Sequence, residues 1–182
     1  MREAYRPPNL PDRNLVWGEP MIRIVKAALV ASVGLHALFY ALQNLANLSQ
    51  AHGALLYVMS LADHEVYPVT AFFALDNPAM AWIALGIVLI GEFGAGFFGL
   101  KGGWDLLRAR KAEGAEFHAA KKAGIIAAGL ALLTWFGLFM TFGAAFFQMW
   151  QTPMGTGSME GAFMYSVASA ATILFVCLTA DD

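Results

Sequence analysis

Two side chains inside otherwise apolar stretches of this sequence could do chemistry: Glu92 and His36. Glu92 precedes Lys101 by nine residues, about 13 Å along a helix, and His36 follows Lys26 by ten, about 15 Å. Because these lysines mark the ends of apolar stretches, we expect both side chains near the same depth, close to the middle of a membrane. A charge there costs at least about 2.5–3.5 kcal/mol, so Glu92 must be protonated, paired or in contact with water.

Two hypotheses follow for this candidate intramembrane polar pair. In the first, His36 and Glu92 relay a proton or contact a quinone or an ion. In the second, a neutral Glu92 is hydrogen-bonded to His36 and to the hydroxyl of Thr134, Ser169 or Thr172, and these bonds set the register between helices. We favour the second, because a single acid without a basic partner or a second acid is thin evidence for transport.

The other chemically competent residues do not indicate a cofactor, a metal or a catalytic site. Haem held by two histidines needs a pair at matching depth on facing helices. Only His36 lies within an apolar stretch, since the other three histidines fall outside: His52, His64 and His118. We expect Asp63-His64-Glu65 to be a solvated turn, because three adjacent residues rarely converge on one ion. We therefore expect no catalytic residues, no cofactor, no metal and no enzyme activity.

The elements that must position Glu92 and His36 are membrane helices. The 182-residue chain is 59% hydrophobic and 13% charged, against roughly 45–50% and about 25% in soluble domains. This composition excludes disorder, a coiled coil, a nucleic-acid binder and most soluble enzymes. Four apolar stretches reach the length of about 20 residues that a crossing needs, and lipid requires them to be helical. The sequence predicts an all-α, four-transmembrane-helix bundle with spans at about 24–45, 79–100, 123–148 and 161–180.

The basic residues predict the orientation of these spans. All eleven Lys and Arg residues fall within residues 2–26 and 101–122. Since positive loops stay in the cytoplasm, we expect both termini and the 101–122 loop inside, and the 46–78 and 149–160 segments outside. Residues 1–20 then form a cytoplasmic, proline-rich arm, and 21–182 the transmembrane domain.

A short helix is expected between the first two spans. Segment 50–62 carries apolar residues on one face, Leu55, Val58, Met59 and Ala62, which predicts an amphipathic helix on the outer interface.

Small residues recur at intervals of four in the second and fourth spans. Within lipid, such stripes let helix backbones approach closely. We expect these candidate helix-packing residues to hold the bundle together or to contact a foreign helix: Gly91, Ala95 and Gly99 in one span, and Ala162, Ser166 and Ala170 in the other.

Three motifs resemble one bacterial family. They are the run Met21–Lys26, the run Glu116–Gly124 and the sequence Phe146-Phe147-Gln148-Met149-Trp150. Together with the four-span layout they are similar, over about residues 21–180, to the predicted small integral membrane proteins filed as domain of unknown function 2165. The resemblance implies a bacterial inner membrane and carries no established activity. Relatives tend to have Gly-Gly-Glu where this chain has Gly143-Ala144-Ala145.

These observations favour a non-catalytic accessory subunit of a larger bacterial inner-membrane complex, an energy-transducing one of the respiratory or photosynthetic kind. Its docking surfaces would be the 1–20 arm, the glycine stripe and the 50–62 helix, with lipids as further partners. The alternative is a small proton-coupled carrier or quinone-contacting protein that uses His36 and Glu92. Such a carrier would work as a homo-oligomer. A formal net charge of −2 argues against nucleic-acid partners.

Overall fold

The computed structural model describes residues 19–181, whose regular elements are all helices, with no strand among them. The helices are α1 (Glu19–Ala46), α2 (Leu48–Met59), α3 (Pro78–Arg108), α4 (Gly114–Ala120), α5 (Lys122–Leu132) and α6 (Pro153–Leu178). From Leu133 to Phe146 the chain continues α5 as a π-helical segment, called here the π segment. Four helices, counting α4, α5 and the π segment together, are long and apolar enough to cross a membrane. The arm predicted over 1–20 lies outside the described residues, except that α1 begins at Glu19.

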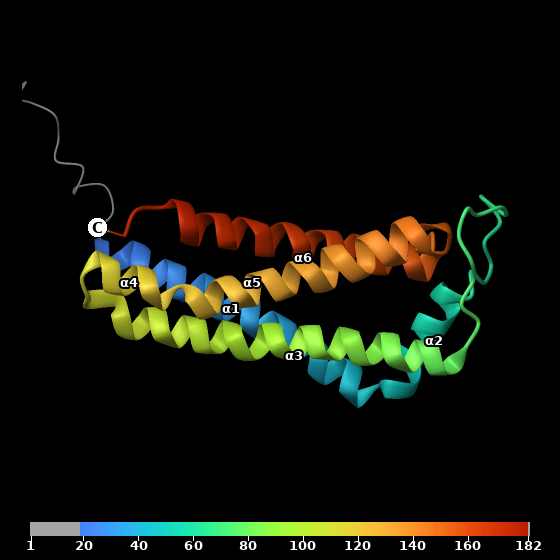
Figure 1. The fold of residues 1–182 in the computed structure, drawn as a ribbon, viewed down its shortest axis with the longest axis horizontal. Helices are drawn as coiled ribbons and strands as arrows, with labels where there is room; N and C mark the ends of the chain where they lie inside the picture. The colour runs from blue at the N-terminus through green and yellow to red at the C-terminus, as the bar shows by residue number, and fades with distance from the viewer. Residues whose placement is uncertain (1–18, 182) are drawn as a thin grey trace, which may run out of the picture.

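The four long helices run side by side along the long axis of the molecule (Figure 1). One close approach joins α1 to α3, where a Cβ on Gly99 would lie 2.4 Å from the Cα of Gly34. A second joins α3 to α5, where a Cβ on Gly102 would lie 2.4 Å from the backbone nitrogen of Gly124. Only hydrogen fits at these positions, so the small residues bring three helices into backbone contact.

Two helices begin at capping residues followed by proline. The Asn77 side chain accepts a hydrogen bond from the Ala79 amide, and Pro78 occupies the first turn of α3. The Thr152 hydroxyl accepts one from the Gly155 amide at the start of α6. Both arrangements satisfy amides that have no partner within the helix. As a result α6 begins within the 149–160 segment expected to be a loop, because the cap and not hydropathy sets its start.

The 101–122 segment, also expected to be a loop, is largely helical. The chain stays in α3 to Arg108, makes a short 3-10 turn over Ala109–Lys111, and forms α4 before α5 begins at Lys122. Phe117 on α4 is fully buried against Ala27 and Leu106, so a small core extends beyond the apolar stretches. We call this end of the bundle the basic end, and the opposite one the α2 end.

The predicted short helix is present as α2, and its apolar face covers the start of α3. Met59 packs with Ala81 and Phe147, and Leu55 and Val58 lie against this cluster. The segment between α2 and α3 then crosses the α2 end of the bundle toward the start of α6 (Figure 1). It is held there by the Tyr67 amide, which donates to the Gln151 side chain at 2.7 Å, and by Phe72, stacked on Phe146 with ring centroids 4.3 Å apart.

Candidate functional site

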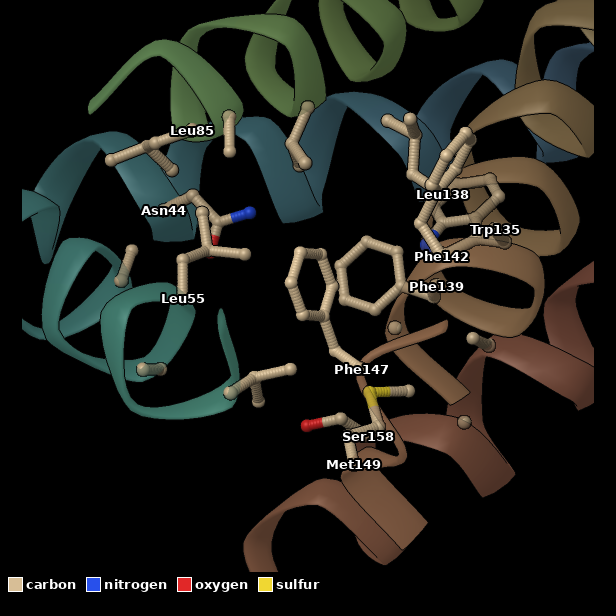
Figure 2. A pocket seen from close by; sticks show the side chains of 18 of the residues that line it. Asn44, Leu55, Leu85, Trp135, Leu138, Phe139, Phe142, Phe147, Met149 and Ser158 are labelled. Atoms are coloured by element: carbon tan, nitrogen blue, oxygen red, sulfur yellow. The ribbon is translucent and has the colours of Figure 1, made fainter. Parts of the chain in front are cut away.

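A cavity of about 840 Å³ lies in the α2 half of the bundle. It lies between α1, α2, α3, the π segment and α6, is partly open at the surface of the bundle, and has a mostly apolar lining. Figure 2 shows Asn44, Leu55 and Leu85 on one side of it and Phe139, Phe142 and Phe147 on the other. The polar side chains that reach it are few: Tyr40, Asn44, Glu92, Ser158 and Tyr165.

The π segment supplies the aromatic wall of this cavity. Trp135, Phe139, Gly143 and Phe147 all line it and are spaced by four residues. In an α-helix, residues spaced by four drift about 40° around the axis at each step. The π segment winds more widely, with bonds from i to i+5. Leu138 and Phe142 line the cavity as well, so a broad face of this segment borders it.

Glu92 is the one acidic residue in the lining, and its side chain is buried, with 1% exposed. The Asn44 amide donates to both carboxyl oxygens, at 3.1 Å and 3.0 Å. A bond from a neighbouring helix lowers the cost of burying this group. Asn44 thus orients Glu92 at the wall of an apolar chamber.

His36 lies behind the cavity wall, in a cluster of aromatic rings. Its ring centroid is 4.9 Å from that of Tyr40, 5.2 Å from Trp135 and 4.2 Å from Tyr165. The Tyr40 and Tyr165 hydroxyls are hydrogen-bonded to each other. Among the described residues, the buried Nε2 of His36 has no hydrogen-bond partner.

His36 and Glu92 are therefore not bonded to each other, and the helix register explains why. Gly34 lies against Gly99, and Leu38 lies against Gly96. Because α1 and α3 run antiparallel, this register places Glu92 opposite residues 41–44, about two turns of α1 beyond His36. The expectation of equal depth used lysines as depth markers, but Lys26 is buried whereas Lys101 is exposed.

The hydroxyls considered as partners of Glu92 do not bond to it. Thr134 donates to the Leu130 carbonyl and Thr172 to the Ala168 carbonyl, each on its own helix. Ser169 is buried on α6. Within residues 19–181, the hydrogen bonds of Glu92 thus run to Asn44 on α1.

The small-residue stripes lie largely inside the bundle. Ala95, Gly99, Ala162 and Ser166 are buried, and Gly91 and Ala170 are half-buried. A Cβ on Gly91 would meet the Thr134 hydroxyl. The structure thus uses these residues for contacts between its own helices, and the glycine stripe is not open for docking.

The family description of predicted small integral membrane proteins, domain of unknown function 2165, matches residues 22–179. The chain belongs to this family. No curated protein and no solved structure matches it.

In this family member, a cluster of basic side chains surrounds Asp181 at the basic end. Lys26 Nζ lies 2.6 Å from Oδ1 and Lys121 Nζ 2.5 Å from Oδ2, and both lysines are fully buried. Lys26 also donates to the carbonyls of Thr179 and Ala180 at the end of α6. Cations at a helix C-terminus are favourable, so these residues tie α1, α5 and α6 together.

Arg23 and the Asp181 carboxylate complete this cluster. Arg23 donates to the Ala112 carbonyl at 2.5 Å and to the Asp181 carbonyl, and its guanidinium lies 4.8 Å from the Phe117 ring centroid. Burial alone raises the pKa of Asp181, but hydrogen bonds from Lys121 and Lys26, together with their charges, outweigh it and lower the pKa below its ordinary value.

The histidines and acids of the α2 end belong to local structure in this family member. His52 bonds to the Pro78 carbonyl at 2.9 Å and stacks on Trp82, and the Tyr57 hydroxyl donates to Asp63. Among residues 19–181, no three side chains of the metal-binding types gather at one point.

The residues that surround His36 and Glu92 in the structure were not among those predicted from the sequence. Asn44, Tyr40 and His36 follow one another at intervals of four on α1, and this row of polar side chains in an apolar helix was a readable signal. The approach of Tyr165 and Trp135 from α6 and the π segment had no local signal, because it depends on how the helices pack.

Proposed function

We propose that this protein is a non-catalytic membrane protein that binds an elongated hydrophobic ligand with a polar head. The single observation that carries the proposal is a cavity with apolar walls that contains one buried carboxyl group, Glu92. Its volume lies within the roughly 300–1,000 Å³ typical of ligand sites. Apolar walls with a few convergent polar groups are also typical of such sites.

The chemistry of the lining supports a hydrophobic occupant. Water is a poor filler, because the mostly apolar lining offers it few hydrogen-bond partners. A hydrocarbon chain would instead make favourable contacts with these walls.

The membrane setting is part of the same proposal. The positive-inside rule supports cytoplasmic termini in a bacterial inner membrane, with α2 on the outer interface and the cavity in the outer half of the bilayer. The ligand would then enter from the outer leaflet.

A non-catalytic protein that binds a lipid-soluble ligand would supply that ligand to an enzyme or hold it beside one. We therefore retain, as its proposed role, an accessory subunit of a larger inner-membrane complex, respiratory or photosynthetic. A proton-coupled carrier remains the alternative, and it would use the same cavity. The two roles differ in whether the ligand is released across the membrane.

Mass spectrometry of molecules retained by the protein, purified in mild detergent, tests the binding proposal. Gly157 lines the cavity, and a Cβ there meets open space, so Gly157→Leu should obstruct part of the cavity without a clash. Gly86→Leu is the matched control, because Gly86 has equal room and does not line the cavity. We expect a lipid-soluble molecule to be retained by the wild type and by Gly86→Leu and to be lost from Gly157→Leu. Equal retention by all three, or by none, would overturn the proposal.

A further inference from the structure

We propose that the ligand carries a cationic, ammonium-type head that pairs with Glu92. This inference rests on the proposed function, because it names the class of molecule that the cavity accepts. It follows from three observations: the charge balance around Glu92, the aromatic rings beside it and the apolar walls beyond.

The first observation is that no basic side chain of residues 19–181 is paired with Glu92. Its hydrogen-bond partner is the neutral amide of Asn44. Among residues 19–181, the basic side chains on α1, α3 and α5 lie toward the basic end. Lys101, the nearest along α3, is about 13 Å away by helical rise and pairs with Asp105. Lys26 and Lys121 pair with Asp181.

Ionising Glu92 in a chamber of low polarity is costly while no cation is near it. A ligand with a positive head offsets this cost, because the two charges attract strongly where water is scarce. An anionic head, such as that of a fatty acid, offers Glu92 no such attraction and is disfavoured.

The second observation is a set of aromatic faces that line the same cavity. Tyr40, Trp135 and Tyr165 all reach it, with ring centroids 5.1 Å to 6.2 Å apart. Aromatic faces attract cations, and groups of them recognise quaternary ammonium ions. His36 packs against all three rings and is absent from the cavity lining, so it supports the cluster from behind.

The third observation concerns the rest of the lining, which sets the shape of the ligand. Away from Glu92 the walls are formed by Leu55, Val58, Phe142, Phe147 and Met149. These side chains suit a hydrocarbon tail and offer it no hydrogen bonds. A single-tailed lipophilic amine or quaternary ammonium ion satisfies both ends of the chamber.

The test compares two probes that share a tail and differ in the charge of the head. Binding of decyltrimethylammonium and of decanol is measured by calorimetry on the full chain in zwitterionic lipid nanodiscs, with empty nanodiscs as the blank. We expect the wild type to bind the cation at least about tenfold more tightly than the alcohol. Glu92→Gln should lose this preference and still bind the alcohol. Gly157→Leu should weaken both probes, and Gly86→Leu neither.

The outcomes separate this inference from the proposed function. Equal binding of both probes to the wild type would overturn the cationic head and leave the cavity as a general hydrophobic site. Binding of neither probe, with Gly157→Leu indistinguishable from wild type, would overturn both proposals. The comparison in the wild type decides the matter even if Glu92→Gln fails to fold.

Discussion

Asp181 is the residue whose removal should reveal most about the basic end. Its carboxylate, 13% exposed, is shared by Lys26 and Lys121, whose side chains are 0% and 1% exposed. Asp181→Asn leaves two buried cations side by side. Breaking a fully buried pair costs about 3–5 kcal/mol, and partial exposure of Asp181 reduces the expected loss to about 2 kcal/mol. Unfolding followed by tryptophan fluorescence in detergent measures the loss.

Asp105→Asn is the control for that measurement. Asp105 pairs with Lys101 one helical turn away on the surface of α3, where both side chains are partly exposed. Such pairs contribute about 0.3–0.5 kcal/mol. If the two variants lose equal stability, Asp181 does not hold the basic end together.

The lowered pKa of Asp181 also predicts a pH dependence. A carboxyl group whose pKa is lower in the folded state contributes stability above its unfolded pKa, and this is lost as the pH falls through the folded pKa. The contribution of Asp181 should therefore be complete at neutral pH and disappear below its ordinary value of 3.8. The difference in unfolding free energy between wild type and Asp181→Asn, measured against pH, isolates it from other carboxyl groups. A constant difference down to strongly acidic pH would contradict this assignment.

At the scale of helices, the contact between α1 and α3 depends on two glycines. A Cβ on Gly99 would lie 2.4 Å from the Cα of Gly34, and backbone cannot move aside as a flexible side chain can. Gly99→Val should force the helices apart and lower the free energy of unfolding by about 1–3 kcal/mol. Gly86→Val, where a Cβ meets nothing within 4 Å, should change it little. Similar losses in the two variants would show that the close contact is not what stabilises this pair.

The same helices show what a sequence can and cannot predict. Four spans follow directly from long apolar runs, because lipid permits only helices there. The start of α6 at Pro153 was missed because it is set by a local cap. The partners of Glu92 depend on the register between Gly34 and Gly99, which no pattern within one helix encodes. The π segment, which carries Phe139 of the cavity wall, was not predicted either, because no pattern in its composition distinguishes a π-helix from an α-helix.

The two ends of the whole molecule have opposite characters. At the basic end, Arg23, Lys26 and Asp181 fasten the tips of the helices together through buried polar contacts. At the α2 end, the helices surround a cavity of about 840 Å³, and apolar and aromatic contacts hold the segments that cover it. The polar contacts and the cavity therefore lie at opposite ends of the bundle, so substitutions at the basic end should leave the lining of the cavity unchanged.

The orientation of the molecule in the membrane gives a final prediction. Cys177 is the only cysteine, so Cys177→Ser provides a background for single labels at two exposed positions, Glu65 beside α2 and Lys111 at the basic end. With positive loops inside, a membrane-impermeant maleimide added to intact cells should label Glu65→Cys. It should label Lys111→Cys only after the cells are opened. The reverse pattern would place the cavity in the inner leaflet and exclude entry of a ligand from outside.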